Sequence, residues 1–130
     1  MRKLLYVAVA VTLMCGCSGS TPEEQAAKAA KKYYDLLAKG KAIEFLEGKA
    51  DVGDMPADYC EQLLKAVRQY GSNMKQKHQG LRRVEVSPNV ARRDTTLRVT
   101  YAFLLLTFGD STKEEITVPM VERDGQWLMR

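Results

Sequence analysis

The C-terminal stretch VTYAFLLLTFGDSTKEEITVPMVERDGQWLMR, residues 99–130, alternates apolar and polar residues through much of its length. Alternation of this kind predicts β-strands, because successive side chains of a strand point to opposite faces of a sheet. Asp124-Gly125 is typical of a two-residue hairpin turn. We therefore predict three consecutive antiparallel strands, at residues 95–108, 114–122 and 127–130.

The turns of this meander predict which side chains share a face. A two-residue turn at Asp110-Ser111 would pair Leu105 with Ile116, and side chains that pair across strands lie on the same face. The helix-covered face would then comprise Val99, Tyr101, Phe103, Leu105, Ile116, Val118, Met120, Trp127 and Met129. An apolar row on the opposite face is typical of a dimer or partner interface, and this row would be Leu104, Leu106 and Phe108. The alternatives are that the N-terminal segment covers the row or that it is simply exposed.

The residues upstream complete the expected fold. A fourth strand is predicted at residues 81–87, followed by a turn at Pro88-Asn89. Thr21, followed by Pro22 and by Glu24, has the pattern of a capping box at a helix start. Helical spacing of apolar residues predicts three helices, one from Thr21 to Gly40, the others at residues 41–47 and 56–79. Segregated helices and an antiparallel meander predict one α+β domain, with three N-terminal helices on one face of four strands.

The N-terminus has the pattern of a targeting signal. Arg2 and Lys3 precede an apolar run at residues 4–14. A helix of that run would reach only about half of a ~30 Å hydrocarbon core, which is too short for a membrane span. We therefore predict a secretory signal peptide at residues 1–16. The alternative is an ordinary soluble secreted protein that is cleaved nearby.

The residues Met14-Cys15-Gly16-Cys17 resemble the lipobox of bacterial lipoproteins. The resemblance implies cleavage before Cys17 and lipid attachment to its sulfur, with an acyl chain such as palmitate, which would anchor the protein in a membrane. Residues 17–20 would form a lipidated tether and residues 21–130 the domain. Because Ser18, and not Asp, follows the cysteine, we expect the outer membrane of the bacterial cell envelope as the location.

Charge and cysteine content exclude several classes of function. The chain of 130 residues has 20 basic and 16 acidic side chains. Removal of Arg2 and Lys3 with the signal peptide leaves a net charge of +2, which argues against a nucleic-acid-binding protein. One histidine and, after lipidation of Cys17, one free cysteine cannot form a zinc cluster. We expect neither a metal nor a cofactor.

Candidate catalytic residues are few. His78 lies at a predicted helix C-terminus between Lys77 and Gln79, where a cation is favoured by the helix dipole. Catalysis would require a carboxylate or nucleophile beside it. Cys60 lies near the start of the third predicted helix, but neighbouring acidic residues oppose a thiolate. We therefore assign no catalytic residue.

Two side-chain groups are candidates for binding. Tyrosines that are buried need hydrogen-bond partners, and Tyr33, Tyr70, Tyr101 and Trp127 are candidates to line a cavity with polar tips. Ordinary core packing is the interpretation that we favour for these side chains. Arginines around the first predicted hairpin could bind an anion or form a solvated basic loop; these are Arg82, Arg83, Arg92, Arg93 and Arg98.

From Thr21 onward the chain resembles a group of small Bacteroidales lipoproteins whose mature part is a cone-like nuclear-transport-factor-2-like (cystatin-like) domain of unknown function, sometimes labelled lumazine-binding. The residues that carry the resemblance are Tyr33-Tyr34-Asp35, Gly40, Phe45, Gln79-Gly80-Leu81, Val84-Glu85-Val86, Thr107-Phe108-Gly109-Asp110, Val118-Pro119-Met120-Val121 and Asp124-Gly125-Gln126-Trp127. Related families commonly have glycine where Ser111 stands. The resemblance implies this fold and no set of catalytic residues.

These observations favour a non-enzymatic, lipid-anchored envelope domain that binds a protein partner or a small ligand. The partners we expect are the membrane, through the lipid anchor, and a second copy or another envelope protein, but no nucleic acid. The alternatives are an enzyme that uses the cone cavity and a purely structural dimeric module.

Overall fold

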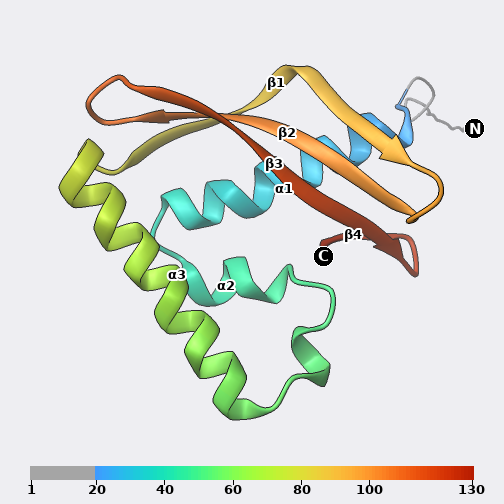
Figure 1. The fold of residues 1–130 in the computed structure, drawn as a ribbon, viewed down its shortest axis with the longest axis horizontal. Coiled ribbons are helices and arrows are strands. Elements are labelled where there is room, and N and C mark those ends of the chain that lie inside the picture. Colours follow the sequence, from blue (N-terminus) through green and yellow to red (C-terminus); the bar gives the residue numbers. More distant parts are fainter. Residues whose placement is uncertain (1–19) are drawn as a thin grey trace, which may run out of the picture.

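The computed structural model describes residues 20–130, so the predicted signal peptide and most of the tether, including Cys17, lie outside the described residues. Residues 20–130 form an α+β domain in which three α-helices pack on one side of a four-stranded antiparallel sheet (Figure 1). The strand order is β1-β2-β3-β4, a plain meander. The predicted fold class is confirmed.

The helices lie close to their predicted positions. Their bounds are Pro22–Ala38 for α1, Ala42–Glu47 for α2 and Ala57–His78 for α3, with a short 3-10 helix η2 at Val52–Asp54. The capping box at the start of α1 is confirmed: Glu24 N donates to Thr21 Oγ1 over 3.1 Å and Thr21 N to Glu24 Oε1 over 3.0 Å. These bonds satisfy backbone donors that a helix start leaves free.

The sheet is built from β1 (Leu81–Asp94), β2 (Val99–Phe108), β3 (Lys113–Arg123) and β4 (Gln126–Met129). The predicted pairing of β3 with β4 is confirmed, with Met120 opposite Met129 and Glu122 opposite Trp127. The predicted pairing of β2 with β3 is wrong by one residue, because Leu104 and not Leu105 lies opposite Ile116.

The loop between β2 and β3 explains the shift. Phe108 N donates to Thr112 O and Ser111 N to Phe108 O, so the loop contains three residues, and Ser111 has a φ of +73°. A turn followed by one left-handed residue is the common three-residue hairpin. A three-residue loop shifts the register of β2 against β3 by one residue, so the side chains of β2 exchange faces relative to a two-residue turn.

The prediction of an exposed interface at Leu104, Leu106 and Phe108 is therefore wrong. These side chains are 0%, 0% and 2% exposed and belong to the core beneath the sheet. The alternate residues of β2, Tyr101, Phe103 and Leu105, are half-buried on the outer face.

Strand β1 continues through the predicted turn. Pro88-Asn89 lies in a β-bulge, since the register with β2 shifts between Val86 and Ala91. The strand bends there (Figure 1), and the chain reverses only after Asp94. The bulge is held by Glu115 on β3, whose carboxylate accepts hydrogen bonds from Ser87 Oγ and, over 3.1 Å, from Asn89 Nδ2. Bulges accommodate extra residues in this way without ending a strand.

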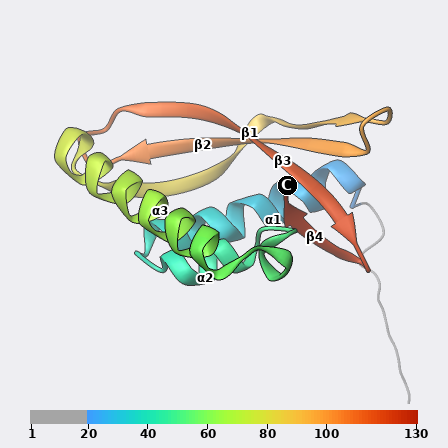
Figure 2. The ribbon, with the colours of Figure 1, turned by 60° about the horizontal axis from the view of Figure 1, so that its bottom comes forward.

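Helix α1 makes the closest contact with the sheet. Its buried residues are alanines, Ala26, Ala27 and Ala30, which let the helix approach β1 and β2. In contrast, α3 has no fully buried residue in the described structure and diverges from the sheet at its N-terminal end (Figures 1 and 2). The domain is thus closed at the α1 side and open at the α3 side.

The C-terminal end of α3 is fixed by the loop between β2 and β3. Gly109 N donates to Gly80 O over 2.8 Å and Asp110 N to His78 O over 3.0 Å. The backbones approach so closely that a Cβ on Gly109 would overlap the carbonyl oxygen of Gln79. Segments that carried the family resemblance therefore meet at this contact.

Replacing Gly109 by alanine should destabilise the protein by about 1–3 kcal/mol, the usual cost of overpacking. The added methyl group would push the β2–β3 loop away from Gln79 and strain both hydrogen bonds. Chemical denaturation measures the loss, and Gly53→Ala is the control because a Cβ there meets no atom within 4 Å. Equal stability of the Gly109 variant and the wild type would contradict the close contact.

Candidate functional site

A groove separates α3 from the rest of the domain. It has a volume of about 430 Å³, which is within the range of small-ligand sites. One wall is α3, and the other walls come from α1, α2 and the beginning of β3. Its lining residues are Tyr34, Leu37, Phe45, Leu63, Ala66, Val67, Tyr70, Glu114, Ile116 and Thr117.

Two phenols and one carboxylate, from Tyr34, Tyr70 and Glu114, stand among these mostly apolar residues, and Thr117 is a further polar residue of the lining. Burial raises the pKa of Tyr34 above its usual value, and the nearby Tyr70 raises it further. Burial also raises the pKa of Tyr70, with a contribution from the negative charge of Glu114. Both phenols therefore stay neutral at neutral pH and can donate or accept hydrogen bonds.

This arrangement is suited to binding. Apolar walls with few convergent polar groups are typical of ligand pockets. Tyr34 is held in place by an edge-to-face contact with Phe45, whose ring centroid lies 5.1 Å away. Within residues 20–130 no group of three potential metal ligands is present, so the groove offers hydrogen bonds, one carboxylate and apolar contact.

A smaller groove continues along β3. It has a volume of about 190 Å³ and shares Tyr34, Phe45 and Thr117 with the first. Its other walls include Val118, Pro119 and Met129. The two grooves together form a trough that runs beside β3.

The structure brings one of the four predicted cavity residues, Tyr70, into the groove. Tyr33 Oη instead donates to Trp127 O over 2.7 Å, and Trp127 Nε1 donates to Gln25 Oε1 over 3.3 Å. Tyr101 lies on the outer face of the sheet, with the Arg92 guanidinium 5.3 Å from its ring centre. The four residues therefore do not form one cavity, and sequence reasoning missed Tyr34 and Glu114.

His78 has a carboxylate partner that was not recognised in the sequence. Its Nδ1 lies 2.9 Å from Asp110 Oδ2, and its ring packs against Phe108. Hydrogen bonds to its carboxylate lower the pKa of Asp110 to about 2. The largest effect comes from Thr112 Oγ1, followed by His78 and by Thr112 N. Because the ionised carboxylate can only accept, His78 Nδ1 is the donor. The pair joins the end of α3 to the β2–β3 loop.

Replacing Asp110 by asparagine should lower the melting temperature at neutral pH. The pKa of Asp110 is depressed in the folded state, so its contribution is present above the unfolded value of about 4 and is lost as the pH falls through about 2. Thermal denaturation of both proteins across this window measures the effect. A difference that persists unchanged at the acid end would contradict a role for the charge.

Cys60 lies at the other end of α3. Its Sγ is 3.7 Å from Val52 O and 4.0 Å from Met55 O, and the side chain is half-buried. The 18 helical steps from Cys60 to His78 correspond to roughly 27 Å along α3. The thiol and the imidazole are therefore too far apart to act together.

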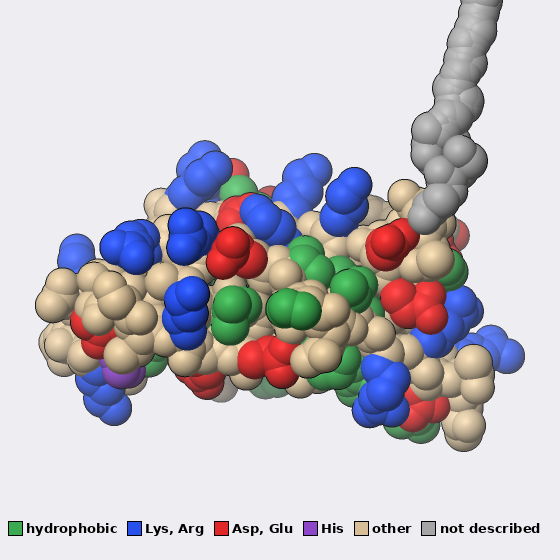
Figure 3. Space-filling view, turned by 90° about the horizontal axis from the view of Figure 1, so that it is seen from above, with side chains coloured by type: hydrophobic (Ala, Val, Ile, Leu, Met, Phe, Trp, Pro, Cys, Tyr) green, Lys and Arg blue, Asp and Glu red, His purple; other side chains and the backbone are tan. Residues whose placement is uncertain are grey.

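The predicted arginine patch is divided. Because Pro88-Asn89 is not a turn, Arg82 and Arg83 lie at the beginning of β1, whereas Arg92, Arg93 and Arg98 lie near its hairpin with β2. All five side chains are exposed. Figure 3 shows Lys and Arg side chains along the upper edge and at both ends of the view, with apolar side chains in its middle. The prediction that all five arginines cluster around one hairpin is therefore wrong, and with it the alternative of a single anion site there.

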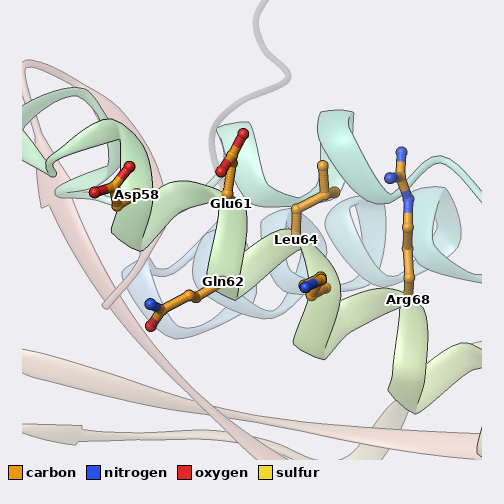
Figure 4. A pocket seen from close by; sticks show the side chains of 6 residues that line it. Asp58, Glu61, Gln62, Leu64 and Arg68 are labelled. Atoms are coloured by element: carbon orange, nitrogen blue, oxygen red, sulfur yellow. The ribbon is translucent and has the colours of Figure 1, made fainter.

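A shallow hollow of about 550 Å³ lies against α3 outside the groove. Its described lining residues all belong to that helix, and Glu61, Leu64 and Arg68 project in similar directions (Figure 4). A hollow lined by charged side chains of a single helix does not enclose a ligand. We therefore take the groove beside Tyr34 and Tyr70 as the candidate site.

The anchoring prediction concerns residues outside the described structure. In the part of the chain that the structure describes, none of the helices combines the length and the apolar character needed to cross a bilayer. Lipid attachment at Cys17 stays a prediction.

Comparison with known proteins supports the fold. Searches for a family model and for a curated protein gave no match. A solved structure does match, that of a candidate NTF2-like transpeptidase from Campylobacter jejuni, with 16% identity and a TM-score of 0.61. The match covers 85% of this chain and 97% of that chain. Identity this low carries the fold and no activity, and we conclude that residues 20–130 adopt an NTF2-like fold.

Proposed function

We propose that this protein is a non-enzymatic binding domain of the bacterial cell envelope, anchored to the outer membrane by lipid on Cys17. Its groove beside α3 holds a protein partner or a small ligand. The resemblance of the sequence to small lipoproteins supports the proposal.

The observation that carries the proposal is the groove itself. Tyr34, Tyr70 and Glu114 converge in it among apolar side chains, and the walls come from four different elements. The loose packing of α3 keeps the groove open at one side. Apolar surface left open in this way is stabilised when an occupant covers it.

The positions of the reactive groups favour binding over catalysis. His78 Nδ1 is engaged by Asp110 at one end of α3, and Cys60 lies near the other end. Neither residue lines the groove. Catalysis by an imidazole or a thiol would require one of them within hydrogen-bond reach of the substrate, and the carboxylate and phenols that do line the groove, Glu114, Tyr34 and Tyr70, form no hydrogen bond with one another.

Native mass spectrometry of the protein, purified from its own membranes in mild detergent, tests the proposal. We expect an added mass on the wild type that is lost when Val67→Lys places a cation in the groove. Tyr59→Lys is the matched control, because Tyr59 is exposed on the same helix and lies outside the groove. An added mass that survives Val67→Lys, or no added mass at all, would contradict binding in the groove.

The same purified material distinguishes an enzyme from a binding domain. The name of the Campylobacter jejuni structure motivates this control. If the bound molecule is converted to a product of different mass during incubation with the wild type but not with Val67→Lys, the groove belongs to an enzyme.

A further inference from the structure

The edge of β3 is open beside the groove. Residues 113–119 pair with β2 on one side, whereas β4 pairs only with Met120–Arg123 on the other. The edge of β4 is covered, because Ala50 N donates to Met129 O over 2.7 Å and Met129 N to Gly48 O over 2.8 Å. Within residues 20–130, no such segment covers Glu114–Val118.

The backbone groups on this edge can be assigned. Arg130 N donates to Pro119 O over 2.9 Å, so the backbone oxygen of Pro119 points away from β2. Successive residues of a strand direct their backbone groups to opposite neighbours. The N–H and C=O groups of Glu115 and Thr117 therefore also point away from β2, and both residues are exposed.

The groove lies where the side chains of an added strand would point. Glu114 and Ile116, which alternate with the outward-directed residues, line the groove together with Tyr34 and Tyr70. The five edge residues span about 17 Å at roughly 3.4 Å per residue. A strand added here would form backbone hydrogen bonds and place every second side chain in the trough.

The charge of Glu114 selects among such strands. Its carboxylate borders Tyr70, whose pKa it raises, and it forms no ion pair or side-chain hydrogen bond with any of residues 20–130. A charged residue that faces inward at an edge disfavours indiscriminate strand pairing. A segment that brings a cation removes this penalty. Glu114 therefore disfavours strands without a cation at this position and favours strands that carry one.

We propose that the partner is an extended peptide segment that adds as a strand to the Glu114–Val118 edge and places a Lys or Arg side chain against Glu114. This inference rests on the proposed function and names the class of partner that the groove takes. Affinity comes from the backbone groups of Glu115 and Thr117, and specificity comes from the side chains that enter the groove.

Calorimetric titration of the full chain in detergent tests the proposal. The probe is an acetylated peptide of about nine residues, alternating valine and threonine, with one valine replaced by lysine. We expect binding, at least tenfold weaker binding by Glu114→Gln, and unchanged binding by Glu61→Gln on the solvent side of α3. The same peptide with N-methylated amides on alternate residues should not bind, because it cannot form the ladder.

A second variant tests the backbone directly. Thr117→Pro removes an outward N–H and spares the ladder with β2, and proline is tolerated on edge strands. It should weaken binding of the peptide at least tenfold while the circular dichroism spectrum stays that of the wild type. If Thr117→Pro alters that spectrum, strand addition is tested by the comparison of the parent peptide with the N-methylated peptide on the wild-type protein.

The outcomes separate this inference from the function on which it rests. Binding of the N-methylated peptide equal to that of the parent would overturn strand addition. Equal binding of the parent peptide and of its lysine-free form would overturn the role of Glu114. An added mass in native spectrometry that depends on Val67, together with no peptide binding, would overturn the inference and leave the proposed function intact.

Discussion

Replacing Leu106 by alanine should lower the free energy of unfolding by about 2–5 kcal/mol. The side chain is 0% exposed and lies in the core between the sheet and the helices. Its removal leaves a cavity that the surrounding side chains fill only in part, and this adds to the lost burial of apolar surface. Urea denaturation followed by circular dichroism measures the loss.

Leu105→Ala is the matched control, because Leu105 is the neighbouring leucine of the same strand and lies half-buried on the outer face. We expect a clearly smaller loss, since less apolar surface returns to water. A larger loss for Leu105 than for Leu106 would show that the faces of β2 are reversed and that the two-residue turn is correct after all.

Replacing Cys17 by alanine should abolish membrane anchoring completely. The lipid would be joined to the Cys17 sulfur, for which alanine offers no substitute, and stable anchoring requires two or more acyl chains. Metabolic labelling with palmitate, followed by membrane fractionation, measures the result, and we expect no label on the variant.

Cys15→Ala serves as the control for this substitution, because Cys15 lies within the predicted signal peptide. It should keep both label and membrane association. Retention of the label by Cys17→Ala with its loss in Cys15→Ala would show that the wrong cysteine was assigned.

The elements of this fold are visible in the sequence, but the faces of β2 are not. Local signals such as the capping box at Thr21 and the turn at Asp124-Gly125 predicted α1 and the β3–β4 register correctly. The β2–β3 register depends on one residue, Ser111, which adopts a left-handed conformation without being glycine or asparagine. The glycine that is common at this position in the families that the sequence resembles was the one available signal for a three-residue loop.

The bulge at Pro88-Asn89 has a similar cause. Proline and asparagine are typical of turns, and only the contact of Ser87 and Asn89 with Glu115 shows that the strand continues. That contact joins residues 26 or more positions apart, which local patterns do not report. The division of the arginine patch follows from the same error.

The sequence offered a cavity lined by tyrosines only as an alternative to core packing, and it did not identify the residues that line the groove. The tyrosine content indicated a cavity with hydroxyl groups, and Tyr70 does line the groove. The choice between Tyr33 and Tyr34 depends on the rotation of α1, and adjacent helix positions differ by about 100°. Asp110 reaches His78 only because the β2–β3 loop folds onto the end of α3, a tertiary contact that the sequence does not encode locally.

Fluorine NMR of the protein containing 3-fluorotyrosine tests the central claim most directly. When the occupant isolated from the native protein is added back, the signals of Tyr34 and Tyr70 should shift, because both rings line the groove. The signal of Tyr101, on the outer face of the sheet, should not move. A shift confined to Tyr101, or unchanged signals of Tyr34 and Tyr70 at saturation, would contradict binding in the groove beside α3.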